Sequence, residues 1–137
     1  MKLLCFEHRE KNALPVEHYR HLVAVRRSGR LLKLKESFAF ETTLSGLMYA
    51  RLIPSWQALG YRVKLMYLSL PNPEMAIARV AERVAQGGHL IPEAAIRRRF
   101  SAGWHNVNSK YKLLVNAWSL YDNSQPKPVL IAEAVND

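Results

Sequence analysis

Residues 60–73, GYRVKLMYLSLPNP, hold the clearest structural signals in the chain. The run from Tyr61 to Leu70 is rich in aromatic and aliphatic side chains, which predicts a strand. Gly60 stands where the C-cap glycine of a helix belongs, so a helix should end just before this strand. Asn72 and Pro73 are typical of an N-cap and a first helical position, so another helix should begin after it. The stretch therefore predicts helix, strand and helix in succession.

The flanking segments continue this alternation. Further strands are predicted over 38–41, 118–121 and 129–135, and further helices over 44–59, 73–86, 92–104 and 109–117. Apolar spacing between Val16 and Leu34 indicates helix, so residues 1–35 are interpreted as a divergent N-terminal helical segment. We therefore predict one α/β domain over 1–137, with a mainly parallel sheet flanked by helices.

Composition is consistent with a cytoplasmic domain. The 137 residues are 49% apolar, enough for one sizeable core, and no apolar run approaches the roughly eighteen residues of a membrane span. The single cysteine, Cys5, excludes an internal disulfide and suits a reducing cytoplasm. A net charge of +9 predicts an anionic partner, which leaves nucleotides, phosphorylated metabolites and nucleic acid open.

Polar residues end the predicted strand over 38–41. Ligands bind at the carboxyl ends of strands in parallel α/β sheets, so Glu41, Thr42 and Thr43 are candidates for substrate binding. Glu41 could accept a hydrogen bond from a hydroxyl or amide, and the threonines could bond a phosphate or sugar. A structural interpretation is equally open, in which Thr or Ser caps the next helix and Glu41 simply leaves the sheet.

Arginines are the other candidates. On a helical wheel, Arg79 and Arg83 lie opposite the apolar residues Ile77, Val80, Ala81 and Val84. In the next helix Arg98 points away from the apolar face. Solvated arginines give the same pattern, but their position on both sides of Gly87 and Gly88 fits a mobile lid that closes over phosphates.

Metal and nucleophile sites have weak support. His18 and His21 are three residues apart without a third ligand nearby, and His89 and His105 are isolated. Cys5 lies in the segment whose structure is hardest to predict from sequence, so it has little support as a catalytic nucleophile. No metal site is predicted from these residues.

The strings FAFETTLSG, GYRVKLMYLSLPNPEMAIARVAERVAQGGHLIPEAAIRRRF and YDNS together resemble the zeta-toxin-like family of P-loop kinases, over about residues 36–133. This resemblance implies ATP-dependent phosphoryl transfer to a hydroxyl of a small molecule, with Mg²⁺. In some members of the family the acceptor is uridine diphosphate-N-acetylglucosamine.

The resemblance also implies residue roles. The acceptor site would contain Glu41, Thr42 and Thr43. A lid at about 79–99 would hold the nucleotide phosphates through Arg79, Arg83 and Arg98, with Arg83 and Arg98 in the catalytic role. Nucleotide binding would further involve Asp122 and Asn123, near the adenine.

The sequence departs from the family in two features. It contains neither the glycine-rich phosphate loop with its lysine nor the stretch that supplies the catalytic aspartate. The chain thus resembles a truncated kinase that lacks the first strand and the phosphate loop, and we expect little or no kinase activity from it alone. A missing strand would leave unpaired sheet edges, which predicts self-association or a protein partner.

Two other functions stay open. Net charge and the run Arg97–Arg99 are compatible with a nucleic-acid or polyanion-binding module, although nucleic acid is the less favoured partner. A non-catalytic interaction protein is the other possibility. No membrane partner is predicted.

Overall fold

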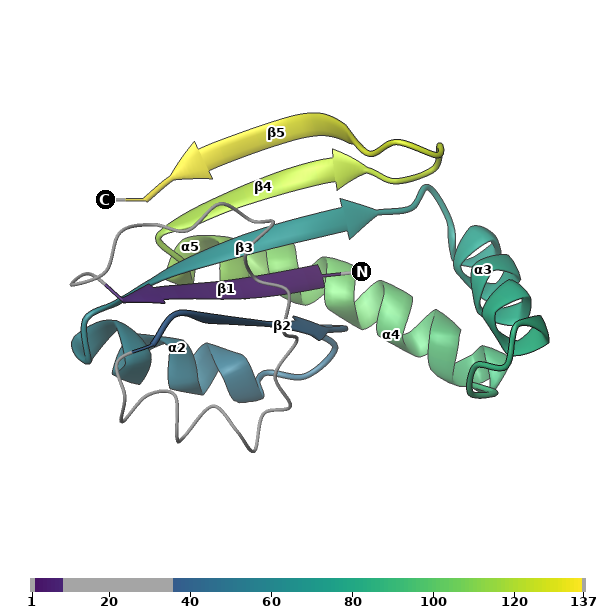
Figure 1. Cartoon of the computed structure of the whole chain (residues 1–137), viewed down its shortest axis with the longest axis horizontal. Coiled ribbons are helices and arrows are strands. Elements are labelled where there is room, and N and C mark those ends of the chain that lie inside the picture. Colours follow the sequence, from purple (N-terminus) through teal and green to yellow (C-terminus); the bar gives the residue numbers. More distant parts are fainter. Residues whose placement is uncertain (1, 9–35, 137) are drawn as a thin grey trace.

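The computed structural model describes residues 2–8 and 36–136, which form a five-stranded mixed sheet with helices packed against it (Figure 1). The spatial strand order is β2-β1-β3-β4-β5. The strands are β1 (Lys2–His8), β2 (Phe38–Thr42), β3 (Tyr61–Ser69), β4 (Ala117–Asp122) and β5 (Val129–Val135). The helices are α2 (Met48–Ala58), α3 (Pro73–Ala85), α4 (Glu93–Asn106), the π turn η2 (Val107–Tyr111) and α5 (Lys112–Leu114).

The α/β class is confirmed, but the prediction of a mainly parallel sheet is wrong. Only β3 and β4 pair in parallel among the described strands, because helices carry the chain back between them. A short connection over 123–128 makes β4 and β5 an antiparallel hairpin. β1 is antiparallel to both of its neighbours, β2 and β3.

The predictions for the amino terminus need a second correction. Residues Lys2–His8 form a strand, so neither a helical segment over all of 1–35 nor the absence of a first strand holds. β1 lies inside the sheet, between β2 and β3. The helix predicted between Val16 and Leu34 lies outside the described residues.

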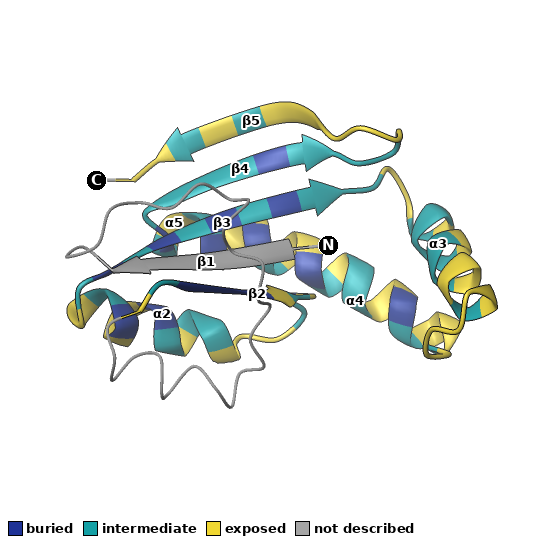
Figure 2. Ribbon diagram, viewed as in Figure 1, coloured by how far each residue is buried: buried dark blue, intermediate teal, exposed yellow. Residues whose placement is uncertain are grey.

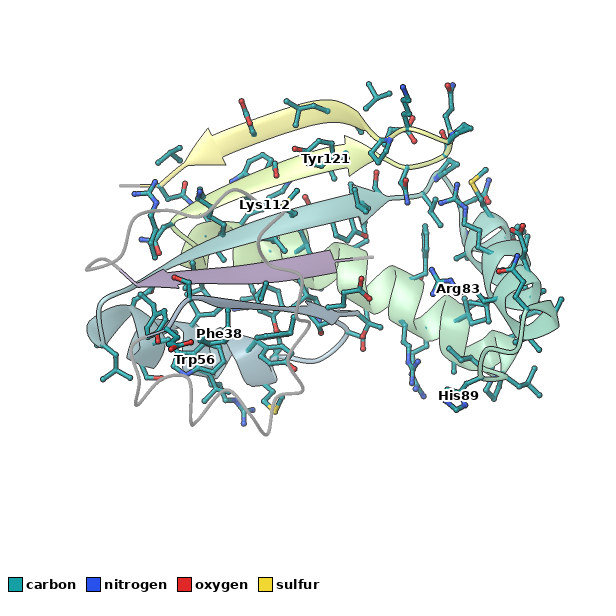
Figure 3. All side chains as sticks on the ribbon, in the orientation of Figure 1. Phe38, Trp56, Arg83, His89, Lys112 and Tyr121 are labelled. Atoms are coloured by element: carbon teal, nitrogen blue, oxygen red, sulfur yellow. The ribbon has the colours of Figure 1, made fainter. Side chains whose placement is uncertain are left out.

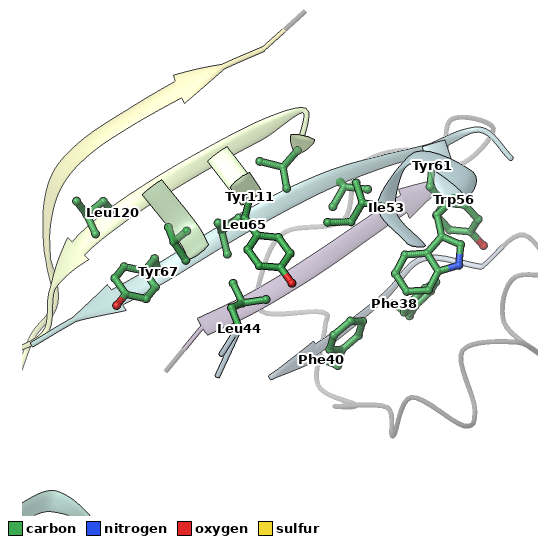
Figure 4. Packing of buried hydrophobic residues seen from close by; sticks show 13 residues of the cluster. Phe38, Phe40, Leu44, Ile53, Trp56, Tyr61, Leu65, Tyr67, Tyr111 and Leu120 are labelled. Carbon is green, nitrogen blue, oxygen red and sulfur yellow. The ribbon is translucent and has the colours of Figure 1, made fainter. Parts of the chain in front are cut away.

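Alternate side chains of β3 build the core. Tyr61, Val63, Leu65 and Tyr67 are buried, while the residues between them are only half-buried (Figure 2). They pack against α2 through Ile53 and Trp56 and against η2 through Val107 and Tyr111 (Figure 4). Fully burying a side chain such as Leu65 stabilises the fold by about 1.5–3 kcal/mol. The sheet is thus fixed to its helical layer through β3.

Helix boundaries on both sides of β3 are as predicted. Gly60 has a left-handed φ of 96° and its amide bonds to the carbonyl of Gln57 at 3.0 Å. The Asn72 side chain accepts a 2.9 Å hydrogen bond from the amide of Met75, with Pro73 as the first helical residue. The expected separate helices over 92–104 and 109–117 are instead one continuous helical rod, in which α4, the π turn η2 and α5 follow one another directly. No helix in the described ranges is long and apolar enough to cross a membrane.

Candidate functional site

A cavity of about 410 Å³ lies beyond the ends of β2 and β3, with α3 and α4 forming its opposite wall. Its volume is within the range of small-molecule sites. The backbone of Lys2 pairs with both Thr42 and Tyr67, so β1 begins at this same end of the sheet. The lining residues come from five segments: Glu41, Thr42, Thr43, Tyr67, Leu68, Leu70, Ala76, Arg79, Val80, Arg83, Ile91, Ile96, Arg99, Phe100 and Asn123.

The candidate acceptor residues Glu41, Thr42 and Thr43 all line this cavity. The Thr42 hydroxyl oxygen accepts a 3.1 Å hydrogen bond from the amide of Leu44, and the hydroxyls of Thr43 and Ser45 lie 2.8 Å apart. These bonds organise the loop rather than cap the next helix, since α2 begins after Leu47 without a side-chain cap. The hydroxyl of Thr42 keeps its own proton to donate.

The loop that carries these hydroxyls is held from the rod formed by α4 and η2. Leu44 is buried and adopts a left-handed φ of 51°, which is uncommon for a residue other than glycine. Its carbonyl accepts a 2.9 Å hydrogen bond from the Asn106 amide group. The Tyr111 hydroxyl donates a 2.7 Å bond to the carbonyl of Gly46. Neither tie was apparent in the sequence.

Arginine side chains form the opposite wall. Arg79 and Arg83 line the cavity together with Ala76 and Val80, so one helical stripe of α3 faces it. The wheel that placed Val80 opposite the arginines is therefore wrong at this position, because Val80 is next to Arg79 and within one turn of Arg83. Arg83 lies in the space between α3 and α4 (Figure 3). In the described part of the chain, neither arginine has an ion-pair partner.

The run Arg97–Arg99 is divided among three environments. Arg97 forms ion pairs with Glu74 at 2.8 Å and Glu93 at 3.0 Å, and its hydrogen bond lowers the pKa of the Glu74 carboxyl. Arg98 is exposed and does not line the cavity, contrary to the role predicted for it. Arg99 lines the cavity instead. Successive helical residues point in different directions, so this run is not one basic surface.

The carboxyl end of β4 and the turn after it contribute one of the two residues predicted there. Asn123 lines the cavity, and its backbone amide donates a 2.9 Å hydrogen bond to the carbonyl of Ser69. The Asp122 carboxylate is turned to its own loop, where it accepts a 2.9 Å bond from the amide of Ser124. Hydrogen bonds from Ser124 lower the pKa of Asp122. Asp122, the last residue of β4, is therefore used to hold the following turn and does not line the cavity.

Gly87 and Gly88 end α3 by a fixed hydrogen-bond pattern. Gly87 has a φ of 95° and donates to the carbonyl of Val84 at 3.0 Å, and Gly88 donates to the carbonyl of Arg83 at 2.7 Å. These two bonds constitute a Schellman motif. The predicted hinge is thus a defined helix end, and it lies directly after a cavity arginine.

The rest of the lining is apolar. Tyr67, Leu68, Ile96 and Phe100 contribute to it, and the Tyr67 ring centroid is 5.7 Å from that of Trp104. Burial raises the pKa of Tyr67 to about 12. The sequence analysis treated these residues only as strand or core residues. Their signal was the position of Tyr67 near the carboxyl end of β3, the same end of the sheet at which β2 ends, with β1 between the two strands.

The donor set fits phosphate and not a metal ion. Guanidinium groups of Arg79, Arg83 and Arg99 face the cavity, and Glu41 is the one carboxylate in its lining. Guanidinium groups donate to phosphate oxygens, whereas Mg²⁺ requires several oxygen ligands. The described ranges contain no group of three His, Cys, Asp or Glu side chains that could hold a metal ion. Phosphates of ATP fit these arginines, but a protein-held Mg²⁺ does not fit this site.

Comparison with known proteins gives one partial relative and no family. An uncharacterized protein from Haemophilus influenzae (strain ATCC 51907 / DSM 11121 / KW20 / Rd) is 32% identical over 69 residues. The match covers 50% of this chain and 49% of that protein. No family model matches the chain, and no solved structure matches it.

Proposed function

We propose that the cavity binds a phosphorylated small molecule, in the class of nucleotides and nucleotide sugars. The observation that carries this proposal is the set of three cavity arginines, Arg79, Arg83 and Arg99, none of which has an ion-pair partner among the described residues. Guanidinium groups that have no carboxylate partner among the described residues favour an anion, and phosphate oxygens match their donor geometry.

The polar rim favours a ligand whose organic part carries hydroxyl or amide groups. Glu41 can accept hydrogen bonds from such groups, while Thr42 and Thr43 can donate to oxygens. Phe100, Ile96 and Leu68 give the same cavity an apolar side, where a ring could pack. Polar rim, basic wall and apolar side together favour a phosphorylated compound over a bare anion.

We propose that this chain is a degenerate relative of the zeta-toxin-like kinases that lacks their phosphate loop. Support comes from the sequence strings and from the position of their residues around one cavity. The sequence has no phosphate loop, and β1 runs antiparallel to the strands beside it. We therefore propose ligand binding with little or no phosphoryl transfer by this chain alone, in the cytoplasm.

Calorimetric titration tests the proposal. Uridine diphosphate-N-acetylglucosamine, ATP and inorganic pyrophosphate are added separately to the purified chain, and the proposal predicts saturable binding of at least the nucleotide sugar or ATP. Phosphoryl transfer from ATP to the nucleotide sugar should stay at background. The kinase part of the proposal fails if the purified chain transfers phosphate, and the binding part fails if no probe saturates.

Self-association is a second proposal, carried by β5. This strand lies at the edge of the described sheet and exposes Val129, Leu130, Ile131 and Val135. An exposed apolar edge strand can pair with a second copy of itself. Glu133 is its one charged residue, and edge charges or prolines that would oppose such pairing are otherwise absent between 129 and 135.

A further inference from the structure

The π turn η2 interrupts regular helix at one point, directly after Asn106. Single π turns inserted in α-helices are often found at functional sites. In an α-helix, residues five apart point about 140° from each other, because each turn takes 3.6 residues. In a π turn the bonds run from i to i+5, so residues five apart return to the same side. Asn106, directly before this turn, and Tyr111, its last residue, are such a pair.

Both residues use this alignment to hold one loop. Asn106 donates to the carbonyl of Leu44, and Tyr111 donates to the carbonyl of Gly46. Tyr111 is fully buried, and its ring lies against Leu44 (Figure 4). The loop between these carbonyls and β2 contains Thr43, which lines the cavity. The π turn thus fixes the polar rim.

The same rod carries the arginine wall on its other end. Arg99 and Phe100 line the cavity from α4, two turns before Asn106. One continuous helical rod therefore sets both the basic wall at Arg99 and the hydroxyl rim at Thr43. A ligand that bonds to both walls at once depends on their separation, whereas a bare anion held by the arginines does not.

We propose that Asn106 and Tyr111 are positioning residues, which act through the loop over 43–46 to set the rim for a ligand that spans rim and arginines. This inference rests on the proposed function of the cavity. Neither residue lines the cavity, so each acts through the loop carbonyl that it holds.

Tyr111→Phe is the sharpest test, because it removes only the hydroxyl. Tyr61→Phe is its matched control: Tyr61 is equally buried and donates its hydroxyl to the carbonyl of Glu36 at 2.9 Å, at the opposite end of β3 from the cavity. Calorimetry is done with uridine diphosphate-N-acetylglucosamine, which can span both walls, and with inorganic pyrophosphate, which reaches only the arginines.

Tyr111→Phe should weaken binding of the nucleotide sugar by about 5- to 10-fold, the equivalent of one hydrogen bond, and leave pyrophosphate affinity unchanged. Tyr61→Phe should leave both affinities unchanged. Unaltered nucleotide-sugar binding by Tyr111→Phe, or an equal loss in Tyr61→Phe, overturns this inference and leaves the proposed function standing. A wild-type chain that binds neither these two probes nor ATP overturns the proposed function, and this inference with it. A wild-type chain that binds pyrophosphate or ATP but not the nucleotide sugar overturns this inference alone.

Discussion

The backbone amide of Gly88 donates a 2.7 Å hydrogen bond to the carbonyl oxygen of Arg83, so the last turn of α3 is fixed at the residue that carries a cavity guanidinium. A Cβ atom added at position 88 would lie 2.8 Å from that oxygen. This oxygen belongs to the backbone, so it cannot move aside as the end of a flexible side chain can. The glycine pair therefore determines where Arg83 stands relative to the sheet.

Gly88→Ala should therefore move the last turn of α3 and weaken ligand binding at Arg83. Gly87→Ala should destabilise the fold by about 1–2 kcal/mol, because an L-residue is strained at a φ of 95°. Gly46→Ala is the control for fold stability only, since nothing lies within 4 Å of an added Cβ there and its carbonyl belongs to the rim loop. Thermal unfolding and calorimetric titration of the three variants compare these effects. Full retention of binding by Gly88→Ala would show that the turn does not position Arg83.

Ile53→Ala should lower the free energy of unfolding by about 2–5 kcal/mol. Ile53 is 0% exposed and belongs to the core cluster between α2 and β3, so truncation leaves a cavity. Leu113→Ala is the control, because Leu113 is 78% exposed and its loss should change stability by no more than about 0.5 kcal/mol. Urea denaturation measures both. Similar losses in the two variants contradict the assigned core.

Stability should fall as the pH rises from about 10 to 12. The Tyr67 pKa is raised by burial to about 12, from an ordinary value of 10.0. Between these values the unfolded chain has lost the phenol proton while the folded protein retains it, so alkali favours unfolding. The loss reaches at most about 3 kcal/mol, from two pKa units at about 1.4 kcal/mol each.

Tyr67→Phe removes this phenol and should flatten the alkaline decline in stability relative to the wild type. Tyrosinate absorbance during a pH titration reports the ionisation itself. A Tyr67 that ionises near pH 10 in the folded protein would contradict the buried position assigned to it.

Ile131→Lys should abolish self-association if β5 pairs with a second copy. Ile131 is 57% exposed, so the folded monomer should tolerate lysine there, while a charge on an edge strand opposes pairing. Sedimentation velocity over a wide concentration range compares the variant with the wild type. A wild-type chain that remains monomeric at every concentration ends this proposal.

Local signals in the sequence predicted the individual elements well. Gly60, Asn72 and Gly87 specify helix ends by backbone conformation or a side-chain cap, and the structure uses each in that way. The positions of the β2 and β3 strands followed from residue type alone. Strand direction did not, because the antiparallel insertion of β1 depends on long-range pairing that no local pattern encodes.

The site was partly predictable for the same reason. Glu41 and Arg83 both line the cavity, as predicted. Each could be chosen from local sequence, because one stands at a strand end and the other on a stripe along a helix. Arg98 and Arg99 could not be told apart, since the choice depends on which flank of α4 faces α3. Asn106 and Tyr111 gave no signal, because their role depends on a π turn whose bonding is set by packing.

Binding of uridine diphosphate-N-acetylglucosamine by arginine variants tests the central claim most directly. Arg83→Ala and Arg99→Ala should each weaken the calorimetric affinity at least 10-fold, the effect of one lost charge-assisted hydrogen bond. Arg98 lies in α4 like Arg99 but outside the cavity, so Arg98→Ala should bind as the wild type does. No saturable binding of either the nucleotide sugar or ATP by the wild type, or an equal loss in Arg98→Ala, would contradict a phosphate site in this cavity.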